Sequence, residues 1–107
     1  DLWNKAIAIN PDYAPALTEL AWAMATSSDD RARQPNAAVR LAERAAALTS
    51  PQTARVLDVL AAALAGSGQF ERAVTTCEAA LANSAGAEST AIRRRLQMYR
   101  ERRPYRE

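Results

Sequence analysis

The stretch LDVLAAALAGSGQFERAVTTCEAALAN, residues 57–83, carries two apolar helical patterns on either side of a Gly-Ser-Gly turn. The apolar residues of its first half recur at i, i+3, i+4 and i+7, at Leu57, Leu60, Ala61 and Leu64. The second half continues at helical spacing with Phe70, Ala73, Val74, Cys77, Ala80 and Leu81. Both halves predict helices with one apolar face, and Gly66 and Gly68 are expected to supply the left-handed backbone between them. Such a hairpin cannot bury its apolar face alone and needs neighbours of the same kind.

Residues 14–49 look like an imperfect copy of this hairpin, with a longer polar inner loop, SDDRARQPN, at 28–36. In the first helix of the copy, 14–27, the residues expected to face the core are Leu17, Leu20, Ala21 and Met24. In the second helix, 37–49, the residues expected to face the core are Ala38, Leu41, Ala42, Ala45 and Leu48. Asn36 is the predicted N-cap of that helix, and Ser50 is the predicted N-cap of a helix that starts at Pro51.

The beginning of the chain, residues 1–10, has the pattern of a second helix from a truncated repeat. Trp3, Ile7 and Ile9 would then lack part of their natural cover. We therefore expect that the chain is a fragment of a longer protein, or that a partner chain covers this face.

The end of the chain predicts a capping helix over residues 87–103. Ile92, Leu96 and Tyr99 recur at i, i+4 and i+7, and the remaining face is charged, as the end of a helical array needs for solubility. Arg95 stands where the repeat pattern would place a leucine. The final RRPYRE is expected to leave the helix at Pro104 and to lie back on the surface through its tyrosine.

The pattern resembles the tetratricopeptide repeat, a helix–turn–helix unit of about 34 residues. The residues that carry the resemblance are Leu57, Leu60, Ala61, Leu64, Ala73, Cys77 and Ala80, with GQFERA similar to the family's GxYxEA turn. Leucine replaces the family's Trp and Tyr at positions 57 and 64. The resemblance implies an all-α fold over residues 1–107, in which helix pairs stack as a right-handed α-solenoid and 52–83 is a regular repeat. The segments AWAMAT, AVRLAERA and RRPYRE also resemble the C-terminal end of bacterial proteins of this family, some of which carry a membrane glycosyltransferase-like region before the repeats.

Composition agrees with a single helical domain: 26 of the 107 residues are alanine, and Gly and Pro are few. The net charge of +2 is distributed unevenly, because residues 93–107 hold seven Arg against two Glu. No apolar run is long enough to span a membrane, and no signal-peptide pattern opens the chain. The sequence leaves a cytoplasmic and a periplasmic location open.

Catalytic and metal-binding patterns are not evident. There is no histidine, which excludes Ser–His and Cys–His nucleophile pairs and His-containing zinc sites. The single cysteine, Cys77, lies on an apolar face and is expected to be a buried small hydrophobic residue, with a reactive thiol as the alternative. Asp29 and Asp30 have too few oxygens for a calcium site, and Gly66-Ser67-Gly68 lacks the Walker pattern of a phosphate loop. The prediction is a protein that is not an enzyme and binds no cofactor or metal.

The resemblance implies a concave groove lined by the first helix of each repeat, which binds a peptide or partner segment. By family register the groove residues are Thr18, Glu19, Trp22, Thr26, Arg55, Asp58, Val59, Ala62, Arg93, Gln97 and Arg100. An aromatic residue exposed in a groove is a typical binding hot spot. The sequence leaves open whether Trp22 is such an anchor or packs against the next helix.

The predicted function is therefore a non-catalytic scaffold that binds a protein or peptide. Two alternatives remain: self-assembly through the open N-terminal helix, and contact of the Arg-rich C-terminal helix with nucleic acid or an anionic membrane surface. The stretch is short and its arginines are poorly interleaved with aromatic residues, which favours a solvated face or an acidic protein partner over nucleic acid.

Overall fold

The computed structural model describes residues 2–50 and 52–107, with side chains from Asn4 onward. Within these residues the secondary structure is six α-helices and no strand, so the all-α prediction is confirmed. The helices are α1 (Leu2–Ile9), α2 (Ala14–Thr26), α3 (Pro35–Leu48), α4 (Ala54–Gly66), α5 (Phe70–Ala82) and α6 (Gly86–Arg100).

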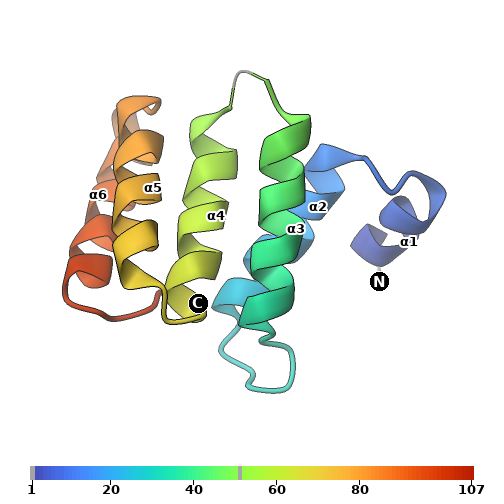
Figure 1. Ribbon diagram of the computed structural model, residues 1–107, viewed down its shortest axis with the longest axis horizontal. Helices are drawn as coiled ribbons and strands as arrows, with labels where there is room; N and C mark the ends of the chain where they lie inside the picture. Colours follow the sequence, from blue (N-terminus) through green and yellow to red (C-terminus); the bar gives the residue numbers. More distant parts are fainter. Residues whose placement is uncertain (1, 51) are drawn as a thin grey trace.

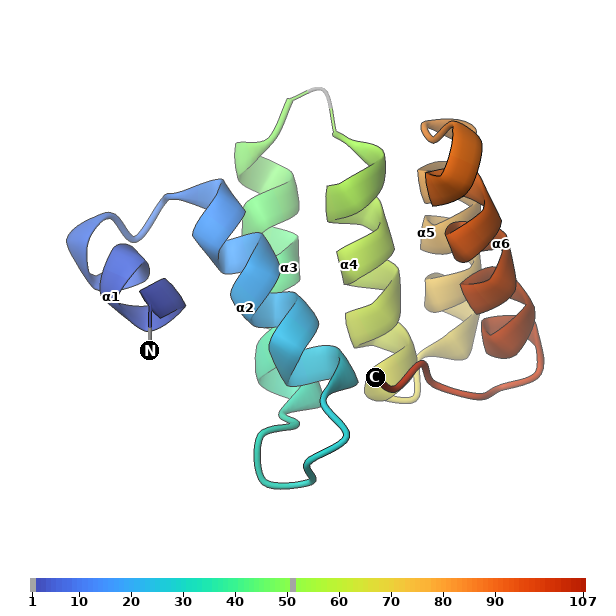
Figure 2. The ribbon, with the colours of Figure 1, turned by 180° about the vertical axis from the view of Figure 1, so that it is seen from behind.

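Each helix packs against the next one along the chain, and α2 also packs against α4. In Figure 1, α3, α4 and α5 stand side by side, α1 lies at one end, and α6 lies at the other end behind α5. The view from behind in Figure 2 places α2 across α3 and beside α4, and it shows the C-terminal tail returning from α6 toward the end of α2. The tail therefore brings the last residues of the chain back to α2, the first long helix.

Helix α4 is the most buried helix of the fold. Ten of its thirteen residues are buried, and Val59, Ala61 and Ala63 are completely inaccessible to solvent. Alanines at 61, 62, 63 and 65 let the backbones of the neighbouring helices come close, while the larger Leu57 and Leu64 fill the remaining space. The stretch 57–83 thus provides the centre of the core as well as a hairpin.

The Gly-Ser-Gly turn ends α4 with a Schellman motif. The amide of Gln69 donates to the carbonyl of Leu64 at 2.8 Å, and the amide of Gly68 donates to that of Ala65 at 3.0 Å. Gly68 has a φ of 87°, which a residue with a Cβ adopts only with strain. Gly66, which was also expected to be left-handed, is instead the last residue of α4.

The same motif ends α6 earlier than predicted. The amide of Arg103 donates to the carbonyl of Met98 at 2.9 Å, and the amide of Arg102 donates to that of Tyr99 at 3.0 Å. Arg102 itself is left-handed, with a φ of 57°. The helix therefore ends at Arg100, and residues 101–107 form a separate tail rather than the last turn of the capping helix.

Both predicted N-caps are wrong. Helix α3 begins at Pro35, so Asn36 is inside its first turn. Proline is favoured at the first position of a helix because its backbone has no N–H to leave unpaired. Helix α4 begins at Ala54, and the cap is Thr53, whose hydroxyl accepts a hydrogen bond from the amide of Val56 at 3.2 Å. The predicted start at Pro51 lies outside the described residues.

Two apolar residues are more exposed than a core residue would be. Leu48, predicted to face the core, is 44% exposed because α3 ends there, beyond its contact with α4. Ile9 is 86% exposed at the end of α1, whereas Ile7 is half-buried. The side chain of Trp3, predicted to be part of the open face of this helix, lies outside the described residues.

Replacing the cap of α4 should test the observed boundary. We expect Thr53→Ala to lower the free energy of unfolding by about 1 kcal/mol, because the amide of Val56 loses its partner. Urea denaturation measures the change. Ser50→Ala is the matched control and should leave stability within about 0.5 kcal/mol; a larger loss at Ser50 than at Thr53 would return the cap to its predicted position.

Candidate interaction surface

Trp22 is the centre of a cluster that joins four segments of the chain. The guanidinium of Arg55, from α4, lies over its ring at 4.7 Å from the centroid, and that of Arg95, from α6, lies at 5.3 Å. The ring of Tyr105, from the tail, is 5.7 Å away and tilted by 36°. Cations over an indole face and tilted aromatic pairs are both attractive arrangements. The half-buried Trp22 is therefore packed against neighbours and also partly accessible, which combines the two alternatives left open by the sequence.

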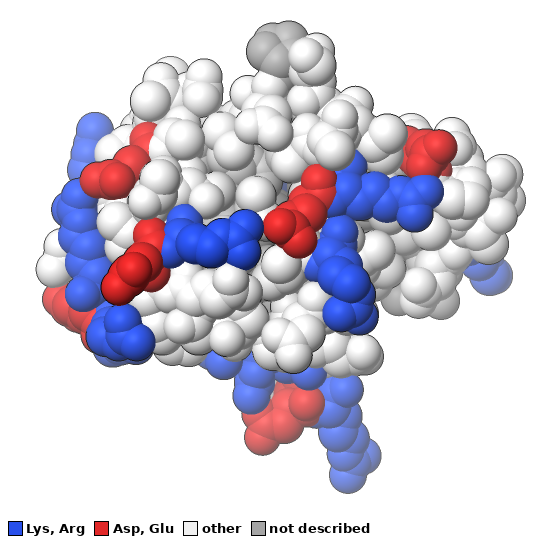
Figure 3. Space-filling model, in the orientation of Figure 1, with Lys and Arg blue, Asp and Glu red and all other residues white. Residues whose placement is uncertain are grey.

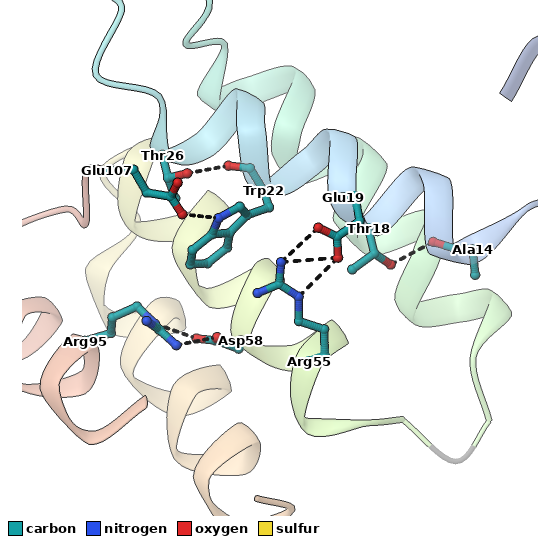
Figure 4. Close-up of polar contacts among 9 residues, drawn as sticks. All are labelled: Ala14, Thr18, Glu19, Trp22, Thr26, Arg55, Asp58, Arg95 and Glu107. Atoms are coloured by element: carbon teal, nitrogen blue, oxygen red, sulfur yellow. Dashed lines mark hydrogen bonds and ion pairs between the residues drawn. The ribbon is translucent and has the colours of Figure 1, made fainter. Parts of the chain in front are cut away.

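Glu19 holds Arg55 in place over the indole. Its two carboxylate oxygens accept three hydrogen bonds from the guanidinium of Arg55, at 3.1 to 3.3 Å. Both side chains are more than a third exposed, so water and salt screen this pair. Figure 4 shows it beside Trp22, on the side that faces the N-terminal end of α2.

Asp58 and Arg95 form a second, buried ion pair on the other side of Trp22. The guanidinium of Arg95 donates to the two carboxylate oxygens of Asp58 at 2.9 and 2.6 Å, and the side chains are only 12% and 4% exposed. Burial acts to lower the pKa of Arg95, but the hydrogen bond and the negative charge of Asp58 outweigh it and raise the pKa above its usual value. Arg95 is thus a fixed cation.

The C-terminal tail lies across this surface. The amide of Glu107 donates to the carbonyl of Thr26 at 2.7 Å, and the indole Nε1 of Trp22 donates to the carboxylate of Glu107. The guanidinium of Arg95 also lies 5.3 Å from the ring of Tyr105. The expectation that the tail returns to the surface through Tyr105 is met, and Figure 4 shows Glu107 of the tail beside Trp22 and Thr26, two of the predicted groove residues.

Five of the predicted groove residues are buried and do not offer an open surface. The hydroxyls of Thr18 and Thr26 donate to carbonyls of their own helix, those of Ala14 and Trp22, both at 2.7 Å. Asp58, Val59 and Ala62 are at most 3% exposed. The prediction that these three face a groove is wrong because α4 is packed against α2, α3 and α5 and is paired with α6 through Arg95.

The predicted continuation of the groove on α6 does not join the cluster around Trp22. Arg93, Gln97 and Arg100 are exposed, and Arg100 pairs with Glu78 of α5 at 3.2 Å. At 100° per residue these three lie on one flank of the buried Ile92–Leu96–Tyr99 face, while Arg95 lies on the other flank. They line a separate hollow of about 500 Å³ with Thr90, Arg94 and Leu96. In Figure 3 the edge of the molecule at α6 is mostly basic.

Arg95, Tyr105 and Glu107 belong to the cluster although the groove prediction did not include them. One signal was present: Asp58 interrupts an apolar run and Arg95 occupies an apolar position, and two opposite charges at core positions are expected to pair. The contacts of Glu107 have no such signal, since they depend on the path of an irregular segment.

An open hollow of about 320 Å³ adjoins the cluster beyond Arg55. It lies between the N-terminal ends of α2 and α4 and is lined mostly by apolar atoms of Ala14, Pro15, Thr18, Glu19, Thr49, Thr53, Arg55 and Val56. The tail does not line this hollow. The surface along α2 therefore has one half covered by the chain itself and one half open.

The single cysteine is part of the core. Cys77 is completely buried, as expected, and burial together with the charge of Asp58 raises the pKa of its thiol to about 12. Across residues 2–50 and 52–107 no three His, Cys, Asp or Glu side chains gather as a metal would require. Nor does any helix in that part of the chain have the length and apolar character needed to cross a membrane.

A scan against protein-family models found no match, and neither did searches of curated proteins and of solved structures.

Separating the buried ion pair should destabilise the fold. We expect Arg95→Leu or Asp58→Leu alone to lower the free energy of unfolding by about 3–5 kcal/mol, because each leaves a buried charge without a partner. The double variant should lose far less than the sum of the two. Chemical denaturation of the four chains gives the coupling energy. Arg72→Leu, which breaks the half-exposed pair with Glu43, is the control and should cost less than about 1 kcal/mol.

The buried thiol should be protected as long as the fold persists. At pH 8 we expect Cys77 to react with a thiol reagent only as fast as the chain opens, because its pKa is raised to about 12. The pKa of this thiol in the folded chain lies above its ordinary value. The stability that the buried thiol contributes to the fold is therefore complete below about pH 9 and falls as the pH rises toward 12. Cys77→Ala should therefore lose less stability over that range than the parent chain. The double variant Cys77→Ala/Thr75→Cys, which carries its only thiol at an exposed position, should be labelled at once. Equally slow labelling of this variant would contradict the explanation that burial protects Cys77.

Proposed function

We propose that this chain is a non-catalytic protein-interaction module that binds an extended segment of a partner along α2 and α4. The proposal includes a right-handed solenoid of the tetratricopeptide type, in which α2–α3 and α4–α5 are successive hairpins and α6 begins a third. The packing of each helix on the next, together with the contact between α2 and α4, supports this stacking. Figure 1 is consistent with it, because neighbouring helices run antiparallel and are joined at alternate ends.

The observation that carries the proposal is the segment already bound at this surface. Residues 103–107 have no regular secondary structure, yet they are held on α2 by a main-chain hydrogen bond, a ring contact and a carboxylate. A surface that holds its own tail in this way has the donors and the aromatic face needed to bind a segment of another protein. The open hollow beside Arg55 adds space that the tail does not use.

The side chains at this surface favour binding over catalysis. Two of its three carboxylates, those of Glu19 and Asp58, accept hydrogen bonds from arginines, and the third, that of Glu107, accepts the indole N–H of Trp22. The oxygens of Glu19 and Asp58 are thus already occupied as hydrogen-bond acceptors within the chain. The cluster is therefore better suited to recognition than to proton transfer.

The two alternative functions have less support. Of the seven C-terminal arginines, Arg95, Arg100 and Arg103 are engaged in ion pairs within the chain, which reduces the charge offered to a nucleic acid. Self-assembly through α1 would rest on the exposed Ile9 and on Trp3, whose side chain lies outside the described residues.

Selection of peptides from a phage-displayed random library tests the proposal. The library is selected against the parent chain and, in parallel, against Tyr105→Ala, in which the tail covers Trp22 less firmly. We expect enriched peptides whose affinity falls at least about tenfold with Trp22→Ala, a loss typical of a hot-spot side chain. The exposed Pro15→Glu, which places a charge in the hollow, should weaken the same peptides, whereas Arg72→Ala on the outer face of α5 should not.

The proposal is overturned if neither form of the chain enriches peptides, or if the enriched peptides bind equally well without Trp22 and with Pro15→Glu. Circular dichroism of each variant separates loss of the surface from loss of the fold.

A further inference from the structure

We propose that the surface around Trp22 recognises an aromatic residue followed two positions later by an acidic residue in an extended partner segment, and that residues 103–107 occupy this surface until such a segment displaces them. The inference rests on the proposed function and adds the chemistry of the ligand and a mode of regulation. Both come from the contacts that the tail makes.

Alternate residues of the tail supply its contacts with Trp22. Tyr105 packs its ring against the indole, and Glu107 accepts the indole N–H. The guanidinium of the intervening Arg106 instead donates to the carbonyl of Tyr105. In an extended chain, side chains at i and i+2 point to the same side, so an aromatic residue and an acid at this spacing can reach one indole together.

The surface has a specific reason to prefer each of these side chains. The aromatic ring of the tail lies beside both the indole of Trp22 and the guanidinium of Arg95, and it gains a ring contact and a cation–π contact at once. The indole Nε1 can donate a hydrogen bond but cannot accept one, so it selects an acceptor, and a carboxylate is the strongest acceptor among side chains. A basic or aliphatic residue at the second position would leave this donor unpaired.

The tail is held by contacts that can be exchanged. Glu107 is exposed and Tyr105 is half-buried, so their contacts are worth much less than those of the buried core. The Schellman motif at Arg102 completes α6 before the tail begins, and the tail can therefore leave without unwinding the helix. Because the tail is tethered, its high local concentration keeps it bound despite these few contacts.

A partner segment can make contacts that the tail does not. The hollow at the N-terminal ends of α2 and α4 begins at Arg55 and Glu19, beside the ring of Trp22. A segment that fills it and continues onto Trp22 would bury apolar surface in addition to replacing Tyr105 and Glu107. This extra contact is what allows a partner to compete with a tethered tail.

The test uses a synthetic peptide, ERRPYRE, which copies residues 101–107, as the probe. Its binding is measured by NMR, from the indole N–H signal of Trp22, on the parent chain and on the double variant Tyr105→Ala/Glu107→Ala. We expect at least about tenfold tighter binding to the double variant, because the apparent affinity for the parent chain is the intrinsic affinity multiplied by the fraction of molecules in which the tail leaves the site free. Peptides with Tyr→Ala or Glu→Gln at the copied positions should bind the double variant more weakly, whereas Arg→Ala at the position of Arg106 should change little.

A second measurement uses the peptides selected from the library. Those that depend on Trp22 should carry an aromatic residue and an acid two positions apart, and they too should bind the double variant more tightly than the parent. If they lack this pattern, or bind both chains equally, the inference fails while the proposed function stands. Failure of ERRPYRE to bind the double variant would also overturn the inference. A concentration-dependent dimer of the parent chain that is lost in the double variant would assign the surface to the tail of a second copy and overturn it as well.

Discussion

The buried ion pair between Asp58 and Arg95 is the constraint on which the arrangement of the C-terminal half depends. A carboxylate that is 4% exposed in the middle of an apolar helix is stable only with a partner, and the guanidinium of Arg95 is that partner. Pairing requires α6 to turn the Arg95 flank of its apolar face toward α4. The opposite flank, with Arg93, Gln97 and Arg100, is then left in solvent or against α5. The rotation of the last helix is thus decided by two charges as well as by its apolar residues.

The small residues of α4 have an equally direct consequence for the surface. Alanines along this helix allow α2, α3 and α5 to approach it closely, and α2 is brought near enough for Glu19 to reach Arg55. Arg55 and Arg95 project from two different helices toward the same indole. The aromatic cluster is therefore a product of helix packing, because none of its cations is close to Trp22 in the sequence.

The C-terminal tail occupies part of the predicted groove, at Trp22. Trp22 was expected either to anchor a ligand or to pack within the fold, and it contacts a segment that is part of the chain but makes the contacts of a ligand. Its partners are polar or only partly buried, in contrast to the apolar contacts that hold α4. Such contacts are selective in chemistry and modest in strength, a combination suited to exchange between an internal and an external segment.

The sequence alone determined the number and type of the helices, because the apolar spacing that defines an amphipathic helix lies within a few residues of chain. The same local information identified Cys77 as a core residue and predicted that the tail returns through Tyr105. It placed the caps at Asn36 and Ser50, since several polar residues in a loop can serve as a cap and the backbone path selects among them. Tertiary structure decided that Val59 and Ala62 are buried, that Arg95 rather than Arg93 faces α4, and that Glu107 reaches Trp22. These outcomes depend on which surfaces of separate helices meet, and that is settled by close packing and by the pairing of buried charges across the whole fold.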